Sequence, residues 1–393
     1  METPSSKKMA KIQLSEFIQN KLKLYPKLRN YDFGNLDDNY ASGLSPIITR
    51  RILSEEYIVR KVLAVFPFKI IEKFIQEICW RTYWKGYLEQ YPSIWESYLK
   101  EIEIFNYVKD TREYMQAVNG KTKIKCFNHW IRTLIRNNYL HNHSRMWFAS
   151  IWSHTLSLPW QLGAEFFMEH LLDADPASNT LSWRWVVGLH TENKSYLARP
   201  DNIQKYTDGN FNPIGFLAED ISKKVKYIKY DKKDLNIKNG FHKKKLHCIL
   251  IHENDLSLHH LPECDILLIQ KTNYKRIKRG TKIKFFIDKC LEGCIKDVKN
   301  QFNAKIFTFE FEKKIKIKKL IQENNITTIH TPYPSIGYLK NEMMIFEKSL
   351  SIKFEYLYSK WDSLFWPHAD KGFFKLKKQI PRILNKLETN IYY

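Results

Sequence analysis

Residues that could bind a ligand are concentrated in one short stretch, LLDADPASNTLSWRW, at positions 171–185. It holds two carboxylates, an asparagine and two tryptophans: Asp173, Asp175, Asn179, Trp183 and Trp185. Two acids flanked by apolar sequence are costly to bury unless they are paired or accept hydrogen bonds. A heterocycle with N–H donors would satisfy them, and an arginine would do so equally well. The tryptophans fit a packed core, and clustered indole rings also allow electrons to move in short steps.

A second set of polar and aromatic residues lies in IIEKFIQEICWRTYWKGYLEQY, residues 70–91. Its apolar residues recur at helical spacing, which predicts an amphipathic helix. The opposite stripe of this helix combines Glu77, Trp80, Arg81 and Trp84. A flat, polar, anionic ligand would use the stacking ring, the carboxylate and the guanidinium together. A structural ion pair beside a buried tryptophan explains the same pattern.

Small and hydroxyl residues precede a predicted helix at ASGLSP, residues 41–46. Backbone N–H groups and serine hydroxyls at the start of a helix can bind an anion. Simple N-capping by Ser42 or Ser45 explains the same residues. Both interpretations stay open from the sequence.

The sequence predicts no metal site. HNHSRM, residues 141–146, brings three functional side chains within one helical turn: Asn142, Arg145 and Met146. Its two histidines, His141 and His143, are two residues apart and point in different directions on a helix. The six cysteines are scattered along the chain: Cys79, Cys126, Cys248, Cys264, Cys290 and Cys294. They form no disulfide framework and no set of four converging ligands, so we predict reduced thiols.

These candidate residues must be positioned by two kinds of structure. Most of residues 12–220 reads as helices joined by short breaks, one of them at Pro159. Residues 223–245 hold ten lysines and little apolar periodicity, which predicts a linker or exposed loop. Short β-rich runs follow, with helical stretches between some of them: LHCILIH, CDILLIQ, AKIFTFEF, ITTIHT and IKFEYLY. This alternation predicts a parallel α/β layer, with domains at 1–222 and 246–393 around the linker.

The overall composition favours a globular protein with an anionic partner. The 393 residues are 44% hydrophobic, and 64 basic against 42 acidic residues give a net charge of +22. Such a charge attracts nucleic acid, although a lysine-rich composition also serves solubility alone. We see no secretory signal and no apolar run long enough for a membrane span, so we expect a cytoplasmic protein. No Walker-type loop, GxGxxG or GxSxG motif occurs, so those three chemistries have no support.

Six motifs, taken in order, resemble the FAD-binding helical domain of the photolyase/cryptochrome family. They lie between about Tyr25 and about Asn212: YPKLRN, SGLSP, EICWRTYW, HNHSRM, LPWQLGAEFF and DADPASNTLSWRW. Their order and spacing carry the resemblance, which looks closest to the cyclobutane pyrimidine dimer photolyases. It implies a mostly α-helical FAD-binding domain, followed here by a smaller α/β domain.

The resemblance implies FAD as the cofactor and assigns residues to it. The FAD phosphates would be held by Tyr25, Ser42, Gly43, Leu44 and Ser45, assisted by Arg81. The set is completed by Asn142, Arg145, Asp173, Asp175 and Asn179, with the two aspartates near the isoalloxazine and Asn179 facing flavin N5. Photolyases commonly carry Asn where plant cryptochromes carry Asp and insect ones Cys. The residue at this position therefore favours repair.

The resemblance also assigns a substrate pocket and an electron path. Glu77 and Trp80 match residues that contact a flipped-out pyrimidine dimer, and Asn142 and Met146 match the lesion pocket. Electron transfer is assigned to Trp183 and Trp160, which match the inner two members of a tryptophan triad. The third position falls near Tyr107 or Phe105 instead of a Trp, and Trp147 or Trp152 could take its place. The expected catalytic set is Trp183, Trp160, Asn179, Glu77 and Met146.

The implied function is light-driven repair of cyclobutane pyrimidine dimers. Reduced FAD would donate an electron to the dimer, the ring would split, and the electron would return. Damaged DNA would be the partner of a monomeric chain. The alternative is a cryptochrome-like blue-light photoreceptor without repair activity, and a third interpretation is a flavoprotein without photochemistry.

Two features depart from the family pattern. The α/β region follows the helical domain instead of preceding it, so it is either a permuted, shortened antenna domain or something unrelated. We therefore assign no antenna chromophore. The iron–sulfur subgroup of the family needs four cysteines around the helical domain, which here offers only Cys79 and Cys126. We therefore predict no cluster.

Overall fold

The computed structural model describes residues 3–34, 38–192, 194–221, 225–237, 245–258, 261–271, 279–311, 313–350 and 352–387. The chain forms two compact units that do not follow its order. The first contains Lys21–Ser42 and Tyr91–Lys232, and the second contains Glu2–Asn20, Gly43–Gln90 and Lys233–Tyr393. We describe each unit by itself.

The predicted domain limits stay a prediction. Within the predicted linker, residues 225–237 contain neither helix nor strand, while 223–224 and 238–244 lie outside the described residues. Among the described helices, none combines the length and the apolar character that crossing a membrane requires.

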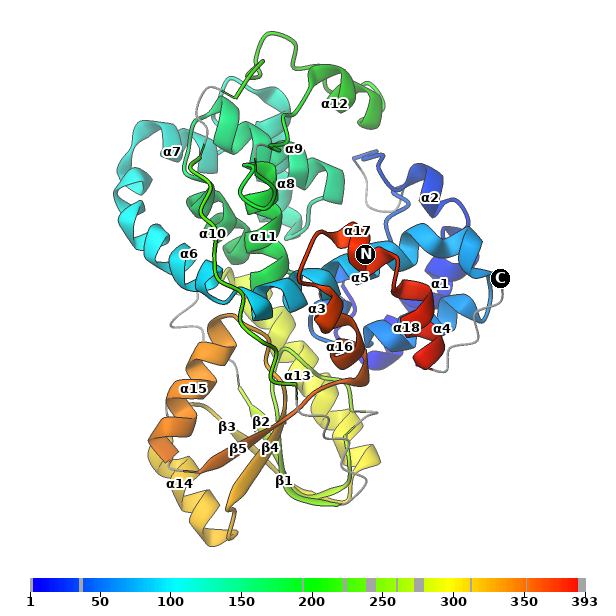
Figure 1. Cartoon of the computed structure of the whole chain (residues 1–393), viewed down its shortest axis with the longest axis vertical. Coiled ribbons are helices and arrows are strands. Elements are labelled where there is room, and N and C mark those ends of the chain that lie inside the picture. The colour runs from blue at the N-terminus through cyan, green and yellow to red at the C-terminus, as the bar shows by residue number, and fades with distance from the viewer. Residues whose placement is uncertain are drawn as a thin grey trace. The chain divides into compact units, whose positions relative to one another are not determined.

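The first unit is built from helices, as the sequence predicts (Figure 1). Its elements are α2 (Tyr25–Leu28), α6 (Ser93–Ile104), η1 (Asn106–Asp110), α7 (Arg112–Val118), α8 (Lys125–Asn137), α9 (Asn142–Ser150), η2 (Ile151–Thr155), α10 (Trp160–His170), α11 (Pro176–Val186) and α12 (Pro200–Tyr206). The η2 segment is a π-helical turn that continues α9. The predicted break at Pro159 is confirmed, because Pro159 is the N-cap residue of α10.

Close packing between α10 and α11 depends on Gly163. A Cβ atom at this position would lie 2.3 Å from Cη2 of Trp183 and 3.0 Å from Nε1 of Trp152. Any larger residue would therefore push α10 away from the indole ring of Trp183. The glycine in LPWQLGAEFF thus positions the helix that carries Trp183.

The second unit contains a five-stranded parallel sheet. Its strands are β1 (Leu246–Ile251), β2 (Cys264–Gln270), β3 (Lys305–Phe309), β4 (Thr328–Pro332) and β5 (Lys353–Leu357), in the order β3-β2-β1-β4-β5. All four strand pairs are parallel, which confirms the predicted α/β layer. The central strands β1 and β2 are almost entirely buried, which explains why they read as continuous apolar runs.

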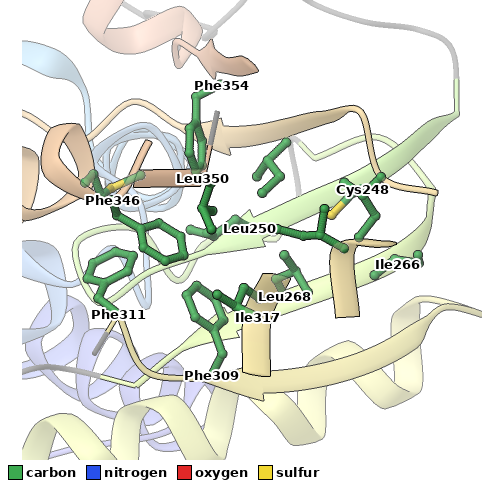
Figure 2. Packing of buried hydrophobic residues seen from close by; sticks show 14 of the residues in the cluster. Cys248, Leu250, Ile266, Leu268, Phe309, Phe311, Ile317, Phe346, Leu350 and Phe354 are labelled. Carbon is green, nitrogen blue, oxygen red and sulfur yellow. The ribbon is translucent and has the colours of Figure 1, made fainter. Parts of the chain in front are cut away.

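Helices cover both faces of this sheet (Figure 1). Helix α13 (Thr281–Gln301) lies on one face, and α14 (Lys314–Glu323) and α15 (Tyr338–Leu350) lie on the other. Figure 2 shows the core under α14 and α15, where Leu250 and Leu268 of the sheet meet Phe346 of α15. Helix α13 connects β2 to β3, and α14 and α15 lead in the opposite direction across the sheet, to β4 and β5. Right-handed crossovers therefore place α13 on one face and α14 and α15 on the other.

The remaining helices of the second unit include one long helix, α5 (Phe68–Gln90). The others are α1 (Lys7–Asn20), α3 (Ser45–Thr49), α4 (Glu55–Leu63), α16 (Lys360–Phe365), η3 (Trp366–His368), α17 (Phe373–Lys377) and α18 (Ile380–Lys386). The indole N–H of Trp361 donates to Oγ1 of Thr82 at 2.8 Å. Gly86 leaves room for Trp366, because a Cβ there would lie 2.7 Å from the indole ring. The C-terminal helices thus pack along α5.

A buried arginine joins three segments of the second unit. Arg51 contacts Glu55 at 3.1 Å, Asp255 at 3.1 Å and Asp362 at 2.6 Å. All four side chains are at most 6% exposed. Burial alone would lower the pKa of Arg51, but the carboxylates outweigh it and raise that pKa well above its usual value. One guanidinium therefore connects α4, the segment after β1, and α16.

Candidate functional site

The first unit pairs Asp173 with an arginine. Asp173 lies between α10 and α11, its side chain is 3% exposed, and its Oδ2 lies 3.0 Å from Nη2 of Arg145. Arg145 is in the first turn of α9, where its Nε donates to the carbonyl of Leu140 at 2.9 Å. Of the two partners that the sequence left open, a heterocycle or an arginine, the structure supplies the arginine for Asp173.

Asp175 fixes the start of α11. It is the N-cap residue, and its Oδ2 accepts hydrogen bonds from the backbone N–H of Ser178 at 3.2 Å and from the Ser178 hydroxyl at 2.7 Å. Pro176 at the first helical position is suited to this start. The second carboxylate of the DADPASN stretch therefore positions α11 by capping, whatever else it binds.

The amide of Asn179 has a defined orientation. Its Nδ2 donates to the carbonyl of Ala164 at 2.8 Å, and the side chain is 9% exposed. A backbone carbonyl only accepts, so the NH₂ group must face Ala164. The amide oxygen then points away from Ala164 and is available to accept from an N–H donor.

The start of α9 is held by a neutral histidine. His141 is the N-cap residue, and its Nδ1 accepts from the backbone N–H of His143 at 3.3 Å. Burial lowers the pKa of His141 to about 4, although nearby Asp32 acts in the opposite direction. The ring is therefore uncharged near pH 7 and keeps its acceptor. Asn142 is exposed on the same turn, and Met146 is half-buried.

The two inner tryptophans of the predicted electron path are both buried. Trp183 is 2% exposed and packs edge-on against Phe167, with ring centroids 5.1 Å apart. Trp160 is 3% exposed and stacks on Tyr98, with centroids 5.6 Å apart and an interplanar angle of 23°. Tyr98 in turn lies 5.4 Å from Trp95, also on α6.

The neighbour of Trp160 was missed by sequence reasoning. The assignment of the outer position to Tyr107 or Phe105 stays a prediction; Tyr107 is 68% exposed and Phe105 is half-buried at the end of α6. The signal that could have found Tyr98 is the apolar stripe of α6, formed by Ile94, Trp95, Tyr98 and Ile102. This stripe faces inward and carries two large rings.

The predicted phosphate-binding residues are divided between the two units. Tyr25 and Ser42 lie in the first unit, where Tyr25 is buried at the start of α2. Gly43, Leu44 and Ser45 lie in the second unit, together with Arg81. Gly43 has a φ of +64°, and a Cβ there would lie 2.6 Å from Nε2 of Gln13.

The N-cap residue of α3 is Leu44, which is fully buried and makes no side-chain capping bond. Capping of this helix by Ser42 or Ser45 is therefore wrong. Ser45 is instead the first residue of α3, followed by Pro46. The assignment of this loop to FAD phosphates stays a prediction.

The predicted substrate residues Glu77 and Trp80 lie on α5 in the second unit, with Arg81 one residue further on. Glu77, Trp80 and Arg81 are all half-buried. One ring face of Trp80 is stacked by Phe373, with ring centroids 3.8 Å apart and an interplanar angle of 12°. The stacking plate that the sequence predicts therefore has an aromatic neighbour from the C-terminal segment.

Residues 74–230 match the family model described as the FAD binding domain of DNA photolyase. A deoxyribodipyrimidine photo-lyase of Buchnera aphidicola subsp. Baizongia pistaciae is 26% identical over 247 residues, covering 58% of this chain and 50% of that protein. The enzyme of the same name from Agrobacterium fabrum is 31% identical over 119 residues, covering 30% of this chain and 25% of that protein. The chain thus spans half or less of the length of these relatives.

Among solved structures, a bacterial class III photolyase from Agrobacterium tumefaciens is similar at 25% identity and a TM-score of 0.45. The match covers 52% of this chain and 43% of that one.

Proposed function

We propose that the chain is a light-driven flavoprotein that repairs cyclobutane pyrimidine dimers, and the match of residues 74–230 to the family model of the FAD binding domain of DNA photolyase supports this proposal. The observation that carries the proposal is the pair between Arg145 and the buried carboxylate of Asp173. It lies inside the matched segment, together with the capping carboxylate of Asp175 and the oriented amide of Asn179.

The chemistry of these side chains fits a flavin. An isoalloxazine offers N–H donors and carbonyl acceptors, which need both kinds of partner. Asp173, Asp175 and Asn179 supply acceptor oxygens, while Arg145 supplies donors. When bound and reduced, FAD would supply the light-driven electron that splits the dimer. The protein would hold the ring system with these residues and with Asn142.

Damaged DNA is proposed to bind through the residues that the resemblance assigns to the lesion. A dimer must leave the base stack, which costs less for a damaged pair than for an intact one. Trp80 would stack on the extruded bases, Glu77 would accept from a base N–H, and Asn142 and Met146 would shape the pocket. Part of the net charge of +22 would contact the flanking phosphates. We propose that the chain acts as a monomer.

Repair is tested with an oligonucleotide that carries one thymine dimer. The purified protein, reduced and illuminated with blue light, should restore the thymine absorbance, as an established photolyase does in parallel. A flavin-loaded, folded protein that leaves the dimer intact while the established enzyme repairs it would refute repair.

A second candidate function is that of a cryptochrome-like photoreceptor without repair activity. The observation that favours it is the stack of Phe373 on Trp80, because the ring face that Phe373 covers is closed to a base. A photoreceptor would still show light-induced changes in flavin absorbance. It would bind damaged and undamaged oligonucleotides equally, whereas a repair enzyme prefers the damaged one.

Tyr98→Leu is expected to slow the light-driven reduction of bound flavin. Trp160 stacks on Tyr98, so the substitution removes the aromatic ring that lies next along this path. Absorbance of the oxidised flavin, followed under blue light with an external reductant, measures the effect.

Tyr107→Leu is the matched control for this measurement, because Tyr107 is 68% exposed. Its rate should match that of the wild type. A Tyr107→Leu protein that is slow, beside a Tyr98→Leu protein of normal rate, would place the outer step at Tyr107 instead.

A further inference from the structure

The stack between Trp80 and Phe373 involves the ring that is assigned to a damaged base. The two rings are nearly parallel, with centroids 3.8 Å apart, and Phe373 also meets Tyr83 edge-on at 5.7 Å. Trp84 lies tilted against Trp80 at 5.3 Å. An incoming base would therefore compete with Phe373 for a face of Trp80.

Helix α17, which carries Phe373, is a short piece between two better-anchored elements. It has five residues, and its two buried side chains are Phe373 and Leu376. On its N-terminal side, the Trp366 carbonyl accepts from Nε2 of Gln90 at 3.0 Å. On its C-terminal side, the carbonyl of Leu387 accepts from the guanidinium of Arg60. Besides its two buried side chains, α17 contacts α5 through Lys377, whose Nζ lies 3.7 Å from Oε1 of Glu72 in a pair that is 35% and 40% exposed. Such a pair contributes little, so we infer that α17 can leave α5 while these contacts on either side of it stay in place.

The outer side of α17 has the character of a nucleic-acid surface. Phe374, next to the stacked ring, is 74% exposed, and Lys371 and Lys378 are also exposed. Between Asp370 and Leu387 the sequence contains six basic residues and one acidic residue. Their field reaches His368, whose pKa is lowered first by burial and then by Lys375, Lys386 and Arg382. Exposed aromatic rings beside lysines are suited to unpaired bases and their phosphates.

We propose that α17 is a lid on Trp80 that single-stranded or extruded nucleic acid displaces. Phe373 holds the ring face that a base takes in the bound state, and Phe374 and the lysines beside it meet the strand that opens the lid. The proposal rests on the proposed function in one respect, the role of Trp80 as a base-stacking residue.

The lid makes binding a competition between two aromatic partners. A weaker stack between Phe373 and Trp80 lowers the free energy that the strand must spend to displace Phe373, so the strand should bind more tightly. A purely structural Phe373 predicts the opposite, because its loss would loosen α5 and the surface around Trp80. The direction of the change in affinity therefore separates the two roles.

The test uses the full chain loaded with flavin and a labelled single-stranded oligothymidylate that contains one thymine dimer. Phe373→Leu keeps an apolar side chain but removes the ring, so it should tighten binding by about two- to tenfold. Phe374→Leu is the matched control, because it leaves the stack on Trp80 intact. It should bind no tighter than the wild type.

Hydrogen exchange in the wild type gives a readout that does not depend on a variant folding. Backbone amides of residues 371–378 should exchange faster when the oligonucleotide saturates the protein. Unchanged or slower exchange there, weaker binding by Phe373→Leu, or no binding by any of the three proteins would overturn the lid. If the oligonucleotide opens α17 but the protein repairs no dimer, the lid proposal stands and the repair proposal is wrong. If the protein repairs the dimer while α17 stays closed, the repair proposal stands and the lid proposal is wrong.

Discussion

Asp173→Ala is expected to yield protein with little or no bound flavin. The substitution removes a carboxylate that is 3% exposed and leaves the guanidinium of Arg145 without its partner at 3.0 Å. Removing one member of a buried ion pair typically costs about 3–5 kcal/mol, because the remaining charge stays desolvated. Arg145 is itself 22% exposed, so water offsets part of this cost. The flavin absorbance per protein measures the loss of bound flavin. Thermal unfolding with added FAD measures the loss of stability.

The matched control is Asp201→Ala, which also removes an aspartate from an arginine. Asp201 contacts Arg199 at 3.2 Å, but their side chains are 70% and 73% exposed. An exposed pair of this kind contributes about 0–1 kcal/mol, so flavin content and stability should stay close to the wild type. If Asp173→Ala purified fully loaded and with an unchanged spectrum, our placement of Asp173 at the flavin would be wrong.

Local patterns were sufficient to predict the sheet and the main helices. The run CDILLIQ forms β2, as its sequence predicts. A strand that helices bury on both faces needs apolar residues at nearly every position, and this run has them. The helix predicted around Ile71 and Phe74 became α5, whose inner side is marked by helical spacing. These elements are determined by residues close together in the chain, which a sequence displays directly.

The pairing of particular side chains could not be predicted in the same way. The sequence allowed Asp173 either a heterocycle or an arginine, and only the fold brings Arg145 of α9 to it. The ring that stacks on Trp80 comes from α17, in a region that the sequence assigned to a separate α/β domain. Such contacts depend on how segments that are distant in the sequence pack against each other in the fold. No local sequence feature marks Phe373 as the partner of Trp80.

Arg51→Met is expected to destabilise the second unit strongly. Three carboxylates, Glu55, Asp255 and Asp362, share this one guanidinium, and each is at most 6% exposed. Without it they repel each other in a site that water reaches poorly, so the loss should be at least about 3–5 kcal/mol. The positive φ of 48° at Arg51 does not contribute to this loss, because methionine experiences the same backbone strain there.

Urea unfolding followed by circular dichroism measures the loss of stability in Arg51→Met. Arg199→Met is the control, because it removes an exposed arginine from its pair and should change stability little. Equal stability of the two variants would mean that the Arg51 cluster is not what joins α4, the segment after β1, and α16.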